Sequence, residues 1–348
     1  MEQIQTPLLS VIIPVYNAED YIEQCVSSVL NEAVCPMEVI CVDDGSTDSS
    51  TVILERIAAD DKRVRVIKQC NSSAGAARNH GLRYAKGEFV HFLDADDRLC
   101  SGIYSRSVKL LQETQSDVCV FQYISYDNST GKMRKRPCLL NSRDRVTSFR
   151  SEPAFFIYNM VAPWNKVYRR EWLEKHALRF DEIVCGNDRG FYFRMLAAGG
   201  SFVLSADCGV IYREKNSKSL TGSNRYRHLD SLFFAWDSSM KAMEGESEEI
   251  RAMTLDCIMK DIFGVFQQAP LEKRKETLEK LQHRFSQTDL SCMSALPVPC
   301  TWHDDFEQIR TGNHSREFND WSGSIFTRVI TGCRIWGIRG YIVKTLAK

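Results

Sequence analysis

Two short acidic motifs contain the residues of this sequence that are best suited to chemistry. The first is Asp-Ala-Asp-Asp at residues 94–97, directly after the apolar run 89–93. Two carboxylates one residue apart, at a turn beyond a strand, can converge on one divalent cation, and their hard oxygens suit Mn²⁺ or Mg²⁺. A cation held there could bridge a diphosphate and neutralise its charge as it leaves. The structural alternative is an ordinary solvated turn.

The second motif, Asp-Asp-Gly-Ser-Thr-Asp at residues 43–48, follows the expected strand 38–42. A carboxylate at the end of a strand, here Asp43 or Asp44, can accept hydrogen bonds from ribose hydroxyls or from a base N–H. Gly45 lets the backbone turn tightly. These residue types also suit any turn, so the motif supports nucleotide binding mainly in combination with the first one.

A stretch of small residues at positions 75–81 is expected to begin a helix. It permits close backbone approach, and Arg78 offers a guanidinium fork to a carboxylate or a phosphate. Arg78 could equally have a supporting role and hold Asp43 or Asp94. The glycine-rich motifs of dinucleotide oxidoreductases and P-loop NTPases are absent from the sequence, which disfavours both classes.

The elements that must position these motifs alternate between apolar strands and amphipathic helices. Strands are expected at residues 8–15, 38–42, 64–67 and 89–93, with helices between them. This order predicts βαβ units and therefore an α/β fold with a mainly parallel sheet. Because ligands of such sheets bind beyond the carboxyl ends of the strands, both acidic motifs should lie at one edge.

The later sequence predicts further elements and a change of character near residue 216. Within the first part we expect a strand at 118–126, a loop region at 127–149, helices at 162–173 and 188–198, and strands at 202–204 and 209–212. Three helices are expected after it, at 228–243, 248–267 and 271–285. The predicted domains are residues 8–215, with halves 8–100 and 101–215, and a helical C-terminal region at 216–348.

Composition restricts the partners and the compartment. The 45 basic and 45 acidic residues give zero formal net charge, so no electrostatic footprint for nucleic acid is present. Thirteen scattered cysteines without zinc-like spacing favour a reducing cytoplasm, and neither a signal peptide nor a spanning helix is expected. The tail at residues 322–348 is basic and aromatic, which suits peripheral contact with the inner face of a membrane. Packing on the protein and dimerisation are alternatives for the tail.

Four blocks in order resemble the family 2 glycosyltransferases: residues 10–17, 43–48, 75–81 and 92–97. The resemblance covers residues 8 to about 215. It implies a GT-A fold, a nucleoside-diphosphate-sugar donor that is commonly UDP-linked, and inversion at the anomeric carbon. By position, the residues that look like nucleotide contacts are Pro14, Tyr16 and Asp44, with Asp43 beside them.

The resemblance also implies roles closer to the reaction. Arg78 looks like a neighbour of the donor, Asp94 like a sugar or ribose contact, and Asp96 like the metal ligand. Residues 164–170 and 186–191 are similar to blocks of the acceptor half, where the family usually has Glu-Asp followed by an aromatic residue. An inverting transfer needs a base for the acceptor hydroxyl, and Asp188 is the candidate. Asn187 departs from the usual Glu, and Asp188 could instead only stabilise the start of a helix.

The resemblance further implies a glycan or lipid-linked acceptor and a role in building a surface polysaccharide such as lipopolysaccharide. Tyr212 and Arg213, with residues 217–219, resemble a block that can close over the diphosphate. One alternative is a catalytically inactive relative that binds a nucleotide sugar or acts as a scaffold. A phosphohydrolase of the haloacid dehalogenase type is a weaker alternative, because its Asp-x-Asp motif lies on the first strand and continues with Gly-Thr. His91, within an apolar strand, is expected to be a core residue.

Overall fold

The computed structural model describes residues 6–32, 36–136, 143–158, 161–214, 225–286 and 292. It divides into two compact units. The first contains the described residues up to 214 together with His228–Met243, and the second contains residues 225–227 and the described residues from 244 onward. The tail at 322–348 and the segment 217–219 lie outside the described residues.

A ten-stranded mixed sheet forms the centre of the first unit, counting the strands of its described residues. The strand order is β3-β2-β1-β4-β9-β6-β10-β5, with β7 paired to β6 and β8 to β10. Its strands are β1 (Leu9–Val15), β2 (Met37–Asp43), β3 (Val64–Lys68), β4 (Phe89–Phe92), β5 (Arg98–Leu99), β6 (Val118–Asp127), β7 (Met133–Arg136), β8 (Arg145–Ser148), β9 (Lys166–Arg169) and β10 (Ser201–Glu214). The strands β3, β2, β1 and β4 run parallel, as do β6 and β10. Antiparallel β9 joins these two groups.

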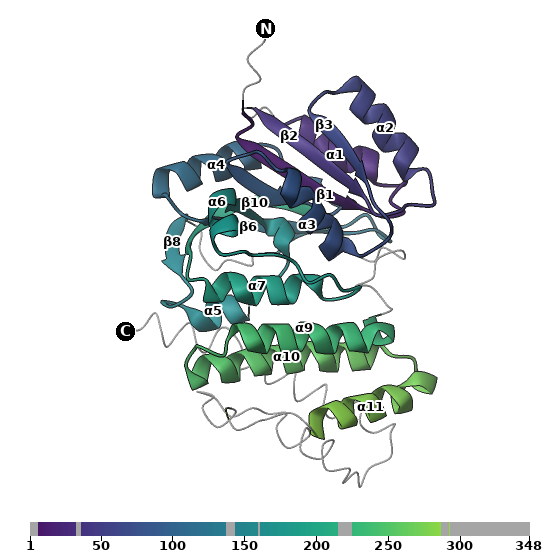
Figure 1. Ribbon diagram of the computed structural model, residues 1–348, viewed down its shortest axis with the longest axis vertical. Helices are drawn as coiled ribbons and strands as arrows, with labels where there is room; N and C mark the ends of the chain where they lie inside the picture. Colours follow the sequence, from purple (N-terminus) through teal and green to yellow (C-terminus); the bar gives the residue numbers. More distant parts are fainter. Residues whose placement is uncertain are drawn as a thin grey trace. The chain divides into compact units, whose positions relative to one another are not determined.

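Helices connect and cover these strands (Figure 1). In the first unit they are α1 (Ile22–Leu30), α2 (Ser50–Asp60), α3 (Ala74–Tyr84), α4 (Ile103–Thr114), α5 (Pro153–Ile157), α6 (Arg170–Lys175), α7 (Asn187–Ala197) and α9 (Leu229–Ala242). The second unit contains α10 (Glu248–Gln268) and α11 (Leu271–Ser286). Short 3₁₀ turns are η1 (Pro163–Asn165) and η2 (Arg225–His228). None of the helices in the described ranges is long and apolar enough to cross a membrane.

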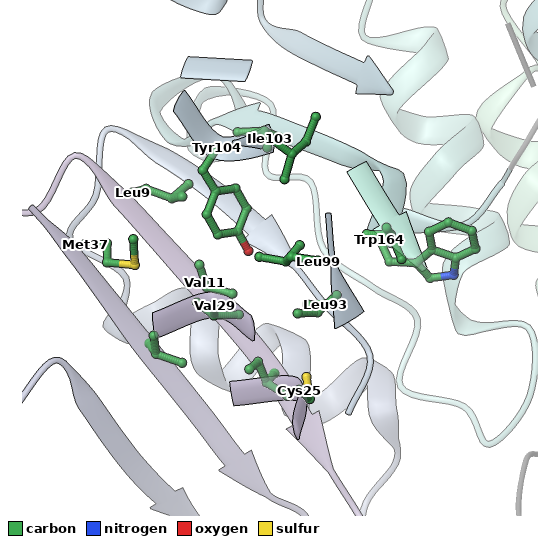
Figure 2. Packing of buried hydrophobic residues seen from close by; sticks show 14 of the residues in the cluster. Leu9, Val11, Cys25, Val29, Met37, Leu93, Leu99, Ile103, Tyr104 and Trp164 are labelled. Carbon is green, nitrogen blue, oxygen red and sulfur yellow. The ribbon is translucent and has the colours of Figure 1, made fainter. Parts of the chain in front are cut away.

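Strand β1 is buried on both faces, as a central parallel strand must be. On one face Val11 packs in a cluster with Val29 of α1 and Tyr104 of α4, all fully buried (Figure 2). On the other face Ile12 lies against α3, where a Cβ on Gly81 would come within 2.5 Å of the Ile12 side chain. Each buried aliphatic side chain contributes about 1.5–3 kcal/mol. The continuous apolar run in the sequence therefore reflects two covered faces.

The structure confirms the α/β fold class, the four parallel strands and the helices at α7, α9, α10 and α11. Three expectations differ from the structure. The region 127–149, expected to be a loop, contributes β7 and β8 to the sheet. Residues 162–173, expected to be a helix, form η1, β9 and α6. The expected pair of closing strands is the single irregular strand β10.

Candidate functional site

The carboxyl ends of β1, β2 and β4 bring both acidic motifs to the same edge of the sheet. Val15, the last residue of β1, pairs with Asp43, the last residue of β2. Strand β4 lies on the other side of β1, and the amide of Leu93 donates to the carbonyl of Ile12 at 3.0 Å. Tyr16 follows β1 and is 51% exposed, so its ring is available to a ligand. Parallel register thus produces the arrangement that the sequence predicts.

Asp43 and Asp44 are buried, and the chain itself supplies hydrogen-bond donors to both. Asp43 Oδ1 accepts from the amide of Ser46 at 2.9 Å, and Oδ2 accepts from the Thr51 hydroxyl. These bonds shape the turn into α2. The role of Asp43 and Asp44 as nucleotide contacts stays a prediction. Both residues also have a structural role, because they accept hydrogen bonds from the chain itself.

The Asp44 carboxylate organises the loop that leads into α3. Its Oδ1 accepts from Gln69 Nε2 at 2.7 Å and from the amide of Ser72 at 2.8 Å. Its Oδ2 accepts from the amide of Ser73 at 3.0 Å. Ser73 in turn caps α3, since its hydroxyl accepts from the amide of Ala76. Asp44 therefore couples the end of β2 to the start of the helix that carries Arg78.

The tetrapeptide at 94–97 forms a tight turn with its last carboxylate buried. The amide of Asp97 donates to the carbonyl of Asp94 at 3.1 Å. Asp97 is 1% exposed, and its Oδ1 accepts from the backbone amide of Arg213 at 2.8 Å. Burial raises the pKa of the Asp97 carboxyl well above its ordinary value, and the neighbouring Asp96 and Asp94 charges raise it further. The Asp97 carboxyl therefore resists ionisation beside the other two carboxyl groups of the turn.

Arg213, near the end of strand β10, contacts this acidic turn. Arg213 Nε donates to the carbonyl of Asp96 at 3.0 Å, and Arg213 Nη1 donates to Asn128 Oδ1 at 2.8 Å. The guanidinium also lies over the ring of Tyr21, with 4.6 Å to the ring centroid. Arg213 is thus held by neutral acceptors next to three carboxylates, which places a positive charge beside the motif.

Arg78 connects the two halves of the domain through a hydrogen bond to Asn187, a contact that was not predicted from the sequence. Its Nη2 donates to Asp94 Oδ1 at 2.6 Å, and its Nη1 donates to Asn187 Oδ1 at 2.7 Å. The supporting partner proposed from sequence, Asp94, is therefore correct, whereas Asp43 bonds elsewhere. The departure at Asn187 from the family pattern was the available signal, but its partner could not be read from a spacing of 109 residues.

Asp188 lies in the first turn of α7, directly after Asn187. It is half-buried, and its carboxylate forms no hydrogen bond or ion pair with any residue that the structure describes. The N-cap of α7 is Gly186, with φ +78°, and no side chain caps the helix. A free carboxylate suits a base, and an acidic residue in a first turn also suits the helix dipole.

His91 is a core residue, as expected from the sequence. Its Nε2 lies 2.8 Å from the carbonyl oxygen of Trp164, and its Nδ1 lies 2.8 Å from the hydroxyl of Tyr104. Because a carbonyl only accepts, Nε2 carries the proton and Nδ1 accepts from Tyr104. Burial lowers the pKa of His91 to about 4, so the neutral imidazole is a structural link between β4, α4 and η1.

Comparison with known proteins shows which family this part of the chain matches. Residues 10–177 match the model of glycosyl transferase family 2. This part of the chain is a family 2 glycosyltransferase domain. The matched region includes all the blocks that carry the resemblance in the N-terminal half, together with η1 and β9. Neither the phosphohydrolase nor the inactive relative is favoured by this match.

Relatives and solved structures agree with the family. The uncharacterized glycosyltransferase EpsJ of Bacillus subtilis is 33% identical over 221 residues, 62% of this chain and 63% of that protein. The putative glycosyltransferase EpsH of the same organism is 34% identical over 194 residues, 55% of this chain and 56% of that protein. The chain therefore spans about three fifths of the length of these relatives.

A solved structure has the same fold at lower sequence similarity. Residues 1–349 of TarS from S. aureus, crystallised in complex with UDP, superpose with a TM-score of 0.69 at 20% identity, covering 87% of each chain. The complex of the same protein with UDP-GlcNAc gives a TM-score of 0.69 at 19% identity. The similarity confirms the GT-A fold.

Proposed function

We propose that the protein is an inverting glycosyltransferase that moves a sugar from a UDP-sugar to a hydroxyl of a glycan or lipid-linked acceptor. The main support is the family match over residues 10–177. The matched region contains both acidic motifs, which follow neighbouring parallel strands and lie at one edge of the sheet. UDP is favoured as the nucleotide since the TarS structures with the same fold contain UDP and UDP-GlcNAc.

The residues at the strand ends divide the donor between them in this proposal. The exposed ring of Tyr16 and the backbone near Pro14 would meet the nucleotide, with Asp43 and Asp44 shaping the adjoining loops. Asp94, held by Arg78, would meet the sugar or ribose hydroxyls. Carboxylates are strong acceptors for hydroxyl donors, so a fixed Asp94 selects the orientation of the donor.

Asp188 would act as the base of a single displacement. The acceptor oxygen forms a bond to the anomeric carbon while the bond from that carbon to the diphosphate oxygen breaks. The acceptor proton moves to an Asp188 oxygen, and the UDP leaves with the electron pair. Attack opposite to the leaving group inverts the anomeric centre. An Asp188 carboxylate without a partner among the described residues is consistent with this role, because no hydrogen bond must be broken first.

The residues at the acidic turn fit a divalent cation only in part. The described residues contain no group of three or more His, Cys, Asp or Glu side chains that could hold a metal. However, the carboxyl groups of Asp94, Asp96 and Asp97 lie in one turn, and one buried Asp97 oxygen, Oδ2, has no hydrogen-bond partner among the described residues. Mg²⁺ and Mn²⁺ sites often use one or two carboxylates completed by phosphate oxygens and water. Asp96 would hold such a cation, which would neutralise charge on the departing diphosphate.

Calorimetric titration with UDP, with and without Mn²⁺, tests the donor and the metal together. We expect binding to tighten when Mn²⁺ is present, and we expect Asp96→Ala to remove that dependence. The exposed Asp60, at the end of α2, provides the matched control, and Asp60→Ala should bind like the wild type. Metal-dependent binding that survives in Asp96→Ala would show that the metal assignment is wrong.

A donor panel tests the reaction itself. Release of nucleoside diphosphate should be measured for several UDP-sugars, with and without lipid-linked acceptors. Acceptor-dependent release from one donor supports the transferase. Tight UDP binding without release from any donor would instead favour the inactive relative.

The proposal for the tail is contact with an anionic membrane surface, which would keep the enzyme at the inner face of the membrane near a lipid-linked acceptor. Removing residues 322–348 should abolish co-sedimentation with vesicles that contain anionic lipid. Equal sedimentation of the full and shortened chains would contradict membrane contact through the tail.

A further inference from the structure

A single guanidinium connects the predicted donor contact to the helix of the predicted base. Arg78 comes from α3, and its side chain is 7% exposed. It donates to Asp94 on one side and to Asn187 on the other, at 2.6 and 2.7 Å. Asn187 is itself buried and is the first residue of α7, directly before Asp188. The three side chains therefore form one chain of hydrogen bonds across the domain, buried at Arg78 and Asn187 and partly exposed at Asp94.

Other contacts already hold α3 against the segment that precedes α7. Asn79 Nδ2 donates to the carbonyl of Phe180 at 2.9 Å, and Asn79 Oδ1 accepts from the amide of Phe180 at 2.8 Å. At Gly75 the backbones approach so closely that an added Cβ would lie 2.1 Å from the carbonyl oxygen of Asp181. These contacts hold the interface together without the bond between Arg78 and Asn187. That bond therefore serves mainly to orient the Arg78 side chain.

The charge of this chain of bonds is balanced because Asn187 is neutral. Among the residues that the structure describes, Asp94 is the single carboxylate paired with Arg78. Burial is the largest cause of the raised pKa of the Tyr168 phenol. The Arg78 charge lowers this pKa and the Asp188 charge raises it, so both charges act on the same ring. A guanidinium released from Asn187 would therefore have Asp188 within its surroundings as an alternative partner.

We propose that Asn187 is a positioning residue, whose amide oxygen holds Arg78 on Asp94 and whose neutrality keeps that pair balanced. Asp94 is then presented to the donor in a fixed orientation, and Asp188 keeps its oxygens for the acceptor proton. In this chain, where Arg78 bridges Asn187 and Asp94, a carboxylate at position 187 would compete with Asp94 for the guanidinium. The inference rests on the proposed function, because it takes the donor to be a nucleoside-diphosphate sugar.

Asn187→Asp is the decisive variant, since it keeps the shape of the side chain and an acceptor oxygen while the amide NH2 becomes a charged oxygen. Binding of UDP-GlcNAc and of UDP-glucose, each with Mn²⁺, should be measured by calorimetry on the full chain. We expect the Kd of the tighter donor to rise about 10- to 150-fold, the range of one charge-assisted hydrogen bond. Asn187→Ala, which removes the acceptor, should weaken binding by a similar factor.

Asn79→Ala is the matched control, because it removes a buried amide from the same interface without touching Arg78. It should lower the thermal midpoint and leave the Kd within about twofold of wild type. Wild-type affinity in Asn187→Asp overturns the inference, as does a loss of affinity that only follows the loss of thermal stability in all three variants. Failure of the wild type to bind any nucleoside-diphosphate sugar is a different result, which overturns the proposed function and this inference with it.

Discussion

The buried imidazole of His91 should make the stability of the first unit depend on pH. Its pKa is about 4 in the folded chain against an ordinary value of 6.5, because burial disfavours the charged ring. Between these pH values the unfolded chain binds more protons than the folded chain, so the free energy of unfolding falls as pH is lowered. The full difference of about 2.5 pKa units corresponds to about 3.4 kcal/mol, reached below pH 4.

At pH 5 about 2 kcal/mol of this contribution should already be lost relative to pH 7.5. Urea unfolding of the wild type and of His91→Gln at both pH values isolates the effect, since the variant cannot titrate at this position. We expect the variant to be less stable at pH 7.5, because it loses the fitted links to Tyr104 and Trp164. Its free energy of unfolding should nevertheless change about 2 kcal/mol less between the two pH values. The same pH dependence in both proteins would refute a buried, neutral His91.

Two further substitutions test the way the site is supported. Gly75→Ala places a methyl group against the backbone carbonyl of Asp181 and should cost about 1–3 kcal/mol in unfolding experiments. Gly264→Ala, in α10, should be neutral or stabilising, because among the described residues no atom outside the adjoining helix backbone lies within 4 Å of the added Cβ. Equal losses in the two variants would contradict the close approach at Gly75. Asp44→Asn replaces an oxygen that faces amide donors and should cost about 1–3 kcal/mol while weakening UDP binding, as calorimetry would show. Unchanged stability would mean that the loop before α3 does not depend on this carboxylate.

The donor half could be predicted from sequence because its signals are local. Apolar runs with no polar face indicate strands covered on both sides, and the parallel connections place both acidic motifs at one edge. The structure shows this arrangement at Asp43 and Asp94. What the sequence did not reveal is that Asp43 and Asp44 are largely occupied by donors of the chain itself. Turn residues and ligand contacts use the same residue types, so composition alone does not separate them.

The acceptor half was harder because tertiary pairing decides its local structure. Residues 166–169 form β9 between β4 and β6, although the surrounding pattern resembles a helix. Lys166 can be buried in that strand because its Nζ donates to Ala162 O and Asn165 Oδ1, each at 2.7 Å. The strands that pair with β9 lie about 45 or more positions away in the sequence, so no local periodicity indicates them. The link from Arg78 to Asn187 was missed for the same reason.

Asp188→Asn tests the proposal that this chain transfers a sugar with Asp188 as the base. The donor that gives acceptor-dependent release with the wild type should be titrated into the variant, and turnover should be measured under the same conditions. We expect donor affinity within about twofold of wild type and turnover reduced about 10²- to 10⁴-fold. Turnover close to that of the wild type, with donor binding intact, would contradict it.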